Sequence, residues 1–152
     1  SEVYGEQSIV AGIDYINVKN KKKVLKENGT NEIKDDIKKY LNKVSKLPVG
    51  EIYLNSIDKD GTGMGLDFSI LDFLPKNNNK SIIMSGGSGN SEHIANGLKN
   101  NSIDAIATAN LLNFVGDGLL KARKELLKKN FNLPIWNVNI IKKLRNKLNK
   151  NY

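Results

Sequence analysis

The chain has 152 residues, with 24 lysines and arginines against 16 aspartates and glutamates, and a formal net charge of +8. It has no cysteine and one histidine, which excludes disulfides, cysteine-ligated zinc and, within this chain, a histidine-based metal site or catalytic triad. No apolar run reaches the roughly 18 residues of a membrane span, and no signal peptide is visible. We therefore expect a cytoplasmic protein with no membrane contact.

Four short apolar runs predict buried strands. They cover residues 8–14, 52–57, 81–85 and 104–108. Each run is followed by polar or glycine residues. A polar stretch lies between the first two runs. In it, Val18, Val24 and Leu25 predict a short hairpin.

Helical periodicity alternates with these strands. Ile33, Ile37, Leu41 and Val44 share one face of a predicted helix over residues 32–47, with Asn31 as its cap. Three further helices are predicted over residues 67–74, 91–100 and 119–129, the first capped by Asp67 and the second by Ser91. Strands that alternate with helices are typical of an α/β fold with a parallel sheet.

The segment from residue 50 to residue 67 is the most informative part of the chain. Its strand ends in two acids, Asp58 and Asp60, and glycines follow at positions 61, 63 and 65. In α/β proteins, ligand sites form at the carboxyl ends of the strands, and free backbone N–H groups there suit phosphate. Similar loops recur at residues 86–89 and 109–110.

Three segments, residues 51–62, 85–89 and 107–110, resemble the cyclase subunit of imidazole glycerol phosphate synthase, a (β/α)8 TIM barrel of histidine biosynthesis. The resemblance implies that residues 1–130 form the second half of such a barrel, about four βα units. Residues 131–152 would be a C-terminal extension with an apolar segment and a basic helix. A whole barrel needs about 250 residues. We therefore expect a longer protein, whose missing N-terminal half, or a second copy, covers the open sheet edges beside Asp14 and Asp104.

The resemblance implies an enzyme: a lyase that closes an imidazole ring on a phosphoribosyl substrate with ammonia from a glutaminase partner, using no metal or cofactor. One alternative is a paralogue that supplies ammonia to amidinate a nucleotide-linked sugar in surface-polysaccharide biosynthesis. Asn110 and residues 113–119 and 134–136 resemble such paralogues more than the histidine enzyme. A second alternative is a non-catalytic half-barrel that binds phosphate ligands or nucleic acid. The lysine runs at residues 19–23 and 142–147 lie outside the motifs and lack interleaved aromatic residues, so a nucleic-acid partner is not expected.

By the same resemblance, Asp14 falls on the family's catalytic aspartate of the second half-barrel, a general acid and base in ring closure. The alternative is an aspartate that caps the following loop. The family's other catalytic aspartate lies on the first strand, outside this sequence. We therefore expect the chain by itself to be catalytically incomplete.

The family's second phosphate site falls on residues of three loops, for which the alternative is a set of ordinary turns. These residues are Asp60, Gly61, Gly87, Ala109 and Asn110. Asn110 stands where the family usually carries a serine. Asn55 and Ser85, at strand ends, are further ligand candidates.

Two residues remain outside these loops. Glu51, at the start of its strand, falls on a glutamate of the family's ammonia gate; the alternative is a surface glutamate. His93, the lone histidine, is expected to be a solvated helix residue.

Overall fold

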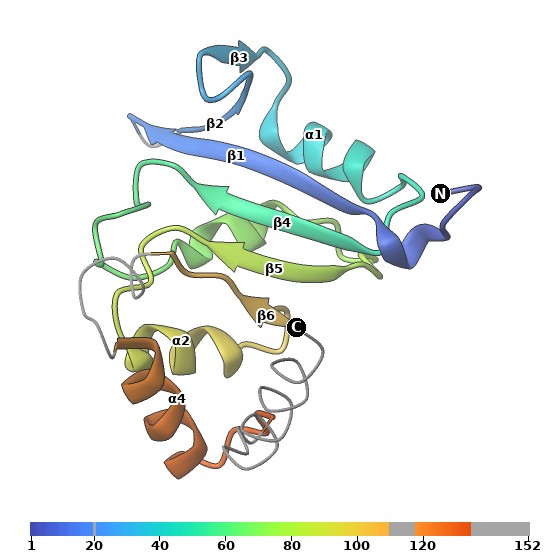
Figure 1. Cartoon of the computed structure of the whole chain (residues 1–152). Helices are drawn as coiled ribbons and strands as arrows, with labels where there is room; N and C mark the ends of the chain where they lie inside the picture. The colour runs from blue at the N-terminus through green and yellow to red at the C-terminus, as the bar shows by residue number, and fades with distance from the viewer. Residues whose placement is uncertain (20, 110–117, 135–152) are drawn as a thin grey trace, which may run out of the picture.

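The computed structural model describes residues 1–19, 21–109 and 118–134, and its centre is one mixed sheet of six strands in the order β3-β2-β1-β4-β5-β6 (Figure 1). The strands are β1 (Val10–Val18), β2 (Lys21–Lys26), β3 (Asn31–Ile33), β4 (Glu51–Ser56), β5 (Ser81–Ser85) and β6 (Ala105–Ile106). The helices are α1 (Ile37–Val44), α2 (Ser91–Leu98) and α4 (Gly118–Lys128), with short 3-10 turns at η1 (Glu6–Ser8) and η2 (Phe68–Phe73).

Four of the strands, β1, β4, β5 and β6, run parallel to one another, with helical segments in each connection between them. The other two, β2 and β3, form an antiparallel hairpin on the outer edge of β1. The predicted α/β fold is therefore confirmed, and the hairpin makes the sheet mixed.

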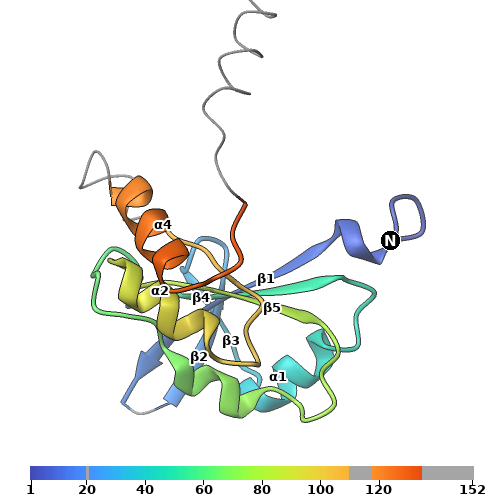
Figure 2. The same ribbon diagram turned by 90° about the horizontal axis from the view of Figure 1, so that it is seen from below.

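Side-chain alternation assigns the core to one face of the sheet. Ile13 and Tyr15 of β1 and Leu54 of β4 are at most 2% exposed and pack against α1 and η2. Figure 2 shows α1 and the segment that contains η2 on the same side of the sheet. A second, smaller cluster joins α2 and α4, with Phe131 and Leu133 packed against it.

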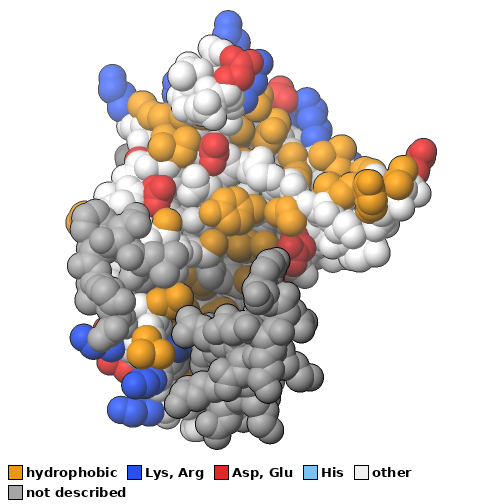
Figure 3. All heavy atoms as spheres, viewed as in Figure 1, with side chains coloured by type: hydrophobic (Ala, Val, Ile, Leu, Met, Phe, Trp, Pro, Cys, Tyr) orange, Lys and Arg blue, Asp and Glu red, His pale blue; other side chains and the backbone are white. Residues whose placement is uncertain are grey.

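The opposite face of the sheet is formed by the residues between these core positions. On β4, for example, the buried residues Ile52 and Leu54 alternate with the half-buried Tyr53 and Asn55. Hydrophobic side chains gather over the middle of the sheet on this face (Figure 3). It is the face that the inside of a closed barrel would present.

The hairpin corrects two predictions. First, residues 31–33 are not helical: positive φ angles at Glu27, Asn28 and Gly29 turn the chain back, so that Ile33 lies opposite Val24 in the sheet. The helix begins only at Ile37, where Asp36 caps it by accepting from the N–H groups of two lysines at 3.0 and 3.2 Å. Ile33 thus packs against the core from a strand.

The second correction concerns the end of β1. The strand was predicted to end at Asp14, but pairing with β2 extends it to Val18. Asp14 lies opposite Leu25, so the hairpin covers this edge of β1 from Asp14 to Val18. Residues 10–13 pair with no strand on that side within the described part of the chain, so a partner that covers the rest of this edge stays a prediction.

None of the described helices is long and apolar enough to cross a membrane. The described residues also contain no cluster of three or more histidine, aspartate or glutamate side chains able to hold a metal ion. Asn110 and the basic helix expected in the extension lie outside the described residues.

Candidate functional site

A row of three polar residues crosses the sheet on the face opposite the core. The parallel register places Asp14 of β1 beside Asn55 of β4, and Asn55 beside Ser85 of β5. The Asn55 amide donates a hydrogen bond to Asp14 Oδ1 at 2.9 Å. The sheet thus gathers one carboxylate, one amide and one hydroxyl from strands far apart in the sequence.

The surroundings of Asp14 differ from those of a loop cap. The strand continues for four residues beyond it, and its carboxylate accepts from Asn55, not from a loop amide. Asp14 is half-buried, whereas its neighbours Ile13 and Tyr15 are almost wholly buried on the core side. Its position suits a carboxylate that is held in place yet can reach a ligand on the open face.

The loops that follow β4 and β5 contact each other through their backbones. In the β4 loop (residues 57–67), Gly65 N–H donates to the carbonyl oxygen of Gly87 in the β5 loop (residues 86–90) at 2.7 Å. Gly87 has a φ of 89°, and a Cβ atom there would lie 2.3 Å from the Gly65 oxygen. Only glycine permits so close an approach.

The loop after β6 joins the same group, because Thr108 Oγ1 donates to the Ser88 carbonyl at 3.1 Å. Within the described part of the chain, the N–H groups of Gly61, Gly87 and Ser88 donate to no protein acceptor. Gly61 has a φ of 75° and open space on its Cβ side. Such free amides on loops at neighbouring strand ends can bind an anion.

The other predicted members of this site have simpler surroundings. Asp60 is exposed, and its N–H turns back to the Ser56 carbonyl at 3.0 Å, so that it belongs to the first turn of the β4 loop. Ala109 is exposed at the end of the described segment.

The lone histidine, expected to be solvated, instead braces the two glycine loops. His93 Nδ1 accepts from Gly89 N–H at 3.2 Å, and the imidazole lies against Gly65, where an added Cβ would be 3.6 Å from Nε2. The cap of α2 is Asn90, whose Oδ1 accepts from the His93 N–H at 2.9 Å, not Ser91 as predicted. Asn90 could have been predicted as that cap, because asparagine is a favoured N-cap residue whose side chain accepts from the backbone N–H three residues later.

A polar cluster lies beneath the β4 loop, on the core side of the sheet, with a buried ion pair and the exposed residues Asn17 and Asp58. Lys22 of β2 and Asp67 form an ion pair whose side chains are 6% and 10% exposed. Asn17 Nδ2 donates to Asp58 at 3.0 Å and to Asp67 at 3.2 Å. Lys22 belongs to the lysine run at residues 19–23, and only the register of the hairpin reveals its buried position.

Two opposing effects act on the pKa of Asp67. Burial raises it, but hydrogen bonds from Lys22, Ser69 and Asn17, together with the positive charge of Lys22, lower the pKa to about 2. Asp67 also caps η2 by accepting from Ser69 N–H at 3.2 Å, as predicted. It is therefore an ionised structural carboxylate.

Glu51 stands at the start of β4, at the opposite end of the strand from Asn55. It lies in a row with Val10 and Ser81 on the face opposite the core and is half-buried. Asn55 is four positions further along the strand, a distance of about 13 Å.

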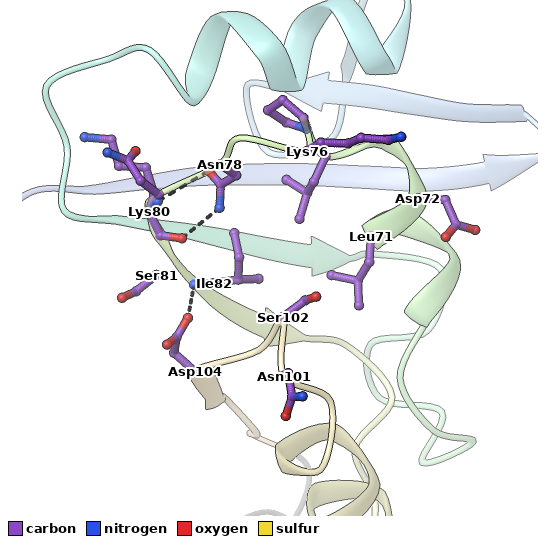
Figure 4. Close-up of a pocket in the computed structure, with 13 residues that line it drawn as sticks. Leu71, Asp72, Lys76, Asn78, Lys80, Ser81, Ile82, Asn101, Ser102 and Asp104 are labelled. Atoms are coloured by element: carbon purple, nitrogen blue, oxygen red, sulfur yellow. Dashed lines mark hydrogen bonds between the residues drawn. The ribbon is translucent and has the colours of Figure 1, made fainter.

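A polar depression of about 580 Å³ lies at the same end of the sheet, away from the glycine loops (Figure 4). Asp104 lines it and accepts from Ile82 N–H at 2.8 Å, which fixes the start of β6 beside β5. Asn78 and Lys80, also on its wall, are joined by a hydrogen bond of 2.8 Å from the Asn78 amide to the Lys80 carbonyl. The depression shares no residue with the candidate anion site.

The chain is similar to known proteins of one family. The family described as "Histidine biosynthesis protein" matches residues 1–116. The chain is 43% identical over 125 residues to a protein of Parasynechococcus marenigrum that is provisionally named imidazole glycerol phosphate synthase subunit hisF2, covering 82% of this chain and 46% of that protein.

Two proteins named imidazole glycerol phosphate synthase subunit HisF are also similar. That of Prosthecochloris aestuarii is 33% identical and that of Chlorobaculum tepidum 31% identical, each over 129 residues that make up 85% of this chain and 51% of the relative. The chain thus spans about half the length of the curated relatives it matches. The resemblance seen in the motifs is confirmed, and the chain belongs to the histidine biosynthesis protein family.

Proposed function

We propose that this chain is the second half-barrel of an imidazole glycerol phosphate synthase cyclase, a lyase that uses glutaminase-derived ammonia to close an imidazole ring on a phosphoribosyl substrate. The observation that carries the proposal is the Asp14 carboxylate on the open sheet face, held at 2.9 Å by Asn55 of β4, the strand that leads into the first glycine loop. An acid/base group and an anion site at the same end of a parallel sheet suit chemistry on a phosphorylated molecule.

Asp14 would act as the general acid and base. Asn55 fixes Oδ1, while Oδ2 has no hydrogen-bond partner among residues 1–19, 21–109 and 118–134. That free oxygen can take a proton from the nitrogen as it forms a bond to the substrate and return a proton to a leaving group. The second aspartate of the family's reaction would come from the N-terminal half of a complete barrel.

The substrate phosphate would bind to the glycine loops. The free N–H groups of Gly61, Gly87 and Ser88 are the donors, and Ala109 and Asn110 would complete the site from the third loop. Asp60 would shape its loop without contacting the anion, because two negative charges repel. Asn55 and Ser85 lie between this site and Asp14, where they could hydrogen-bond substrate hydroxyl groups.

Ammonia would enter at the opposite end of the sheet. Glu51 lies there on the same face as Asn55, which supports a role for it as a gate on the path that ammonia would take from a glutaminase partner to Asp14. The N-terminal half-barrel, or a second copy of the chain, would close this path by covering the apolar middle of the open face (Figure 3).

A second candidate function is the delivery of ammonia for amidination of a nucleotide-linked sugar. It is supported by the resemblance of Asn110 and of residues 113–119 and 134–136 to such paralogues. The same Asp14 row and phosphate loops would serve either substrate.

The deciding experiment offers ammonia to the full-length protein with the phosphoribosyl-aminoimidazole precursor of the histidine pathway. Ring-closed product at a rate that depends on ammonia supports the cyclase. The absence of product, with production of amidinated sugar when the polysaccharide amidotransferase is added, supports the second candidate. No product in either assay, with phosphate binding intact, would indicate a non-catalytic binding module.

A further inference from the structure

One amide group, that of the exposed Asn17 of β1, contacts both ends of the β4 loop. At the start of the loop, Asp58 accepts from Asn17 Nδ2 at 3.0 Å and from Ser56 Oγ at 2.9 Å. At its end, Asp67 accepts from the same Asn17 amide at 3.2 Å. The two carboxylates are therefore tied to a single side chain of β1, and the residues between them, including Gly61, form a closed loop above it.

The positive charge in this cluster comes from the hairpin. Lys22 of β2 pairs with Asp67 and also donates to Asn17 Oδ1 at 2.7 Å. Its ammonium lies 5.2 Å from the centre of the Tyr15 ring, which adds a cation–π contact in a desolvated place. A lysine with a 6% exposed side chain and three such contacts is held in one position.

Lys22 does not face the candidate anion site. It lies opposite Asn17 and two residues before the buried Val24, so both point to the core side of the sheet. Asp14 and Asn55 lie on the other side. Any effect of Lys22 on a bound anion must therefore pass through the β4 loop.

We infer that Lys22 is a positioning residue, which joins the hairpin to Asp67 and so sets where the β4 loop presents the Gly61 amide to a phosphate group. This inference rests on the anion site proposed above. Without the ammonium, Asp67 would be a buried carboxylate that has lost its cation, and such a group moves toward water. The end of the β4 loop would move with Asp67. The Gly65 amide, which contacts Gly87, would move together with the loop.

The test compares Lys22→Met with Lys26→Met in the full-length protein. Both residues lie on β2, both point to the same side of the strand, and both substitutions remove one positive charge. Lys26, however, is 55% exposed and pairs only with its neighbour Glu27 within the part of the chain that the structure describes. Inorganic phosphate is titrated while the backbone amide signals of Gly61 and Gly87 are followed by NMR.

In the wild type, both glycine signals should shift with phosphate and reach saturation. Lys22→Met should raise the Kd for phosphate by about tenfold, the lower range of effects for residues that orient a ligand-binding group, and Lys26→Met should leave it within about twofold. A purely structural role would reduce the folded fraction without changing the Kd. An unchanged Kd in Lys22→Met, or equal weakening in both variants, would overturn the inference.

A double variant covers the case in which Lys22→Met does not fold. Lys22→Met combined with Asp67→Asn removes both charges, avoids an unpaired buried ion and keeps a good helix cap at position 67. It should fold and still bind phosphate about tenfold more weakly than the wild type; wild-type affinity would overturn the role of Lys22. If the wild type itself shows no shift at either glycine, the proposed anion site is refuted together with this role. A wild-type response that the variants leave unchanged refutes the role alone.

Discussion

The substitution Gly87→Ala tests whether the β4 and β5 loops must touch to form the candidate site. Gly87 has a φ of 89°, and its added Cβ would lie 2.3 Å from the carbonyl oxygen of Gly65. That oxygen belongs to backbone, so it cannot rotate away as a flexible side chain could. It would have to withdraw by at least 0.7 Å to reach the 3.0 Å below which real contacts are essentially never found.

The expected loss of stability has two parts. An L-residue in a left-handed conformation costs about 1–2 kcal/mol. Separating the loops weakens the hydrogen bond of 2.7 Å from Gly65 N–H to Gly87 O. A net intramolecular hydrogen bond contributes about 1 kcal/mol, so the free energy of unfolding should fall by about 2–3 kcal/mol. That is a large share of the roughly 5–15 kcal/mol that stabilises a typical domain.

Substitutions at two other glycines distinguish the cost of backbone strain from the cost of the lost loop contact. Gly61→Ala keeps the strain of a φ of 75° but meets no atom within 4 Å, so it should cost only about 1–2 kcal/mol. Gly12→Ala, on β1, has neither strain nor a close contact and should change stability by less than about 1 kcal/mol. The three variants should therefore rank in the order Gly12, Gly61, Gly87.

Urea unfolding of the three variants measures this order, and phosphate titration of the folded proteins measures the site. Gly87→Ala should weaken phosphate binding, because the loop that carries the Gly87 amide must move. If Gly87→Ala loses no more stability than Gly61→Ala and binds phosphate as the wild type does, the close packing of the two loops is not what holds the site together.

Three further predictions concern single side chains. Asp14→Asn in the complete protein should lower ammonia-dependent turnover by about 10²–10⁴-fold and leave phosphate affinity unchanged, as expected for a lost general acid and base; turnover within a few-fold of wild type would exclude that role. Because the folded-state pKa of Asp67 is lowered to about 2, its contribution of roughly 2 kcal/mol should be present above about pH 4 and disappear as the pH falls through 2. The wild type should therefore lose more stability than Asp67→Asn between pH 4 and pH 2 in urea unfolding, and parallel curves would contradict this. His93→Leu removes the acceptor of the Gly89 N–H and should lower the free energy of unfolding by about 1 kcal/mol. His93→Asn can place an oxygen near the position of Nδ1 and should lower it less. Equal losses in thermal or urea unfolding would show that the contact with Gly89 does not contribute to stability.

Local sequence patterns predict the four parallel strands and their common polar end. The apolar runs around Ile52 and Ile82 are short and bounded by turn residues, which favours buried strands over helices, and the acids and glycines that follow then lie where the strands end. The glycine loops can also be predicted from the sequence, because clustered glycines indicate positive φ angles and close backbone contacts. Both occur at Gly87. Asp67 as a helix cap follows from the same local reasoning.

The hairpin is the part that local patterns do not predict in full. Helical periodicity extends back from Ile37 to Ile33, but the turn at residues 27–29 gives Ile33 a strand partner, and pairing with a neighbouring strand outweighs periodicity. The length of β1 has the same cause. Tyr15, Ile16 and Val18 favour a strand, but the sequence does not show that they continue the strand that contains Asp14; pairing with β2 makes them one element.

The same hairpin explains why the role of Lys22 is hidden in the sequence. Lys22 and Asp67 are 45 residues apart, and a lysine in a basic run normally lies in solvent. Only the pairing of Asn17 with Lys22 determines that this lysine, unlike Lys21 or Lys23 on either side, points to the core beneath the β4 loop. A one-residue shift of the register would turn Lys22 outward and bring Lys21 or Lys23 toward Asp67. The hairpin register and the geometry of the phosphate loop are therefore coupled, and a change in the turn that sets this register should affect the loop although it lies outside the motifs by which the family is recognised.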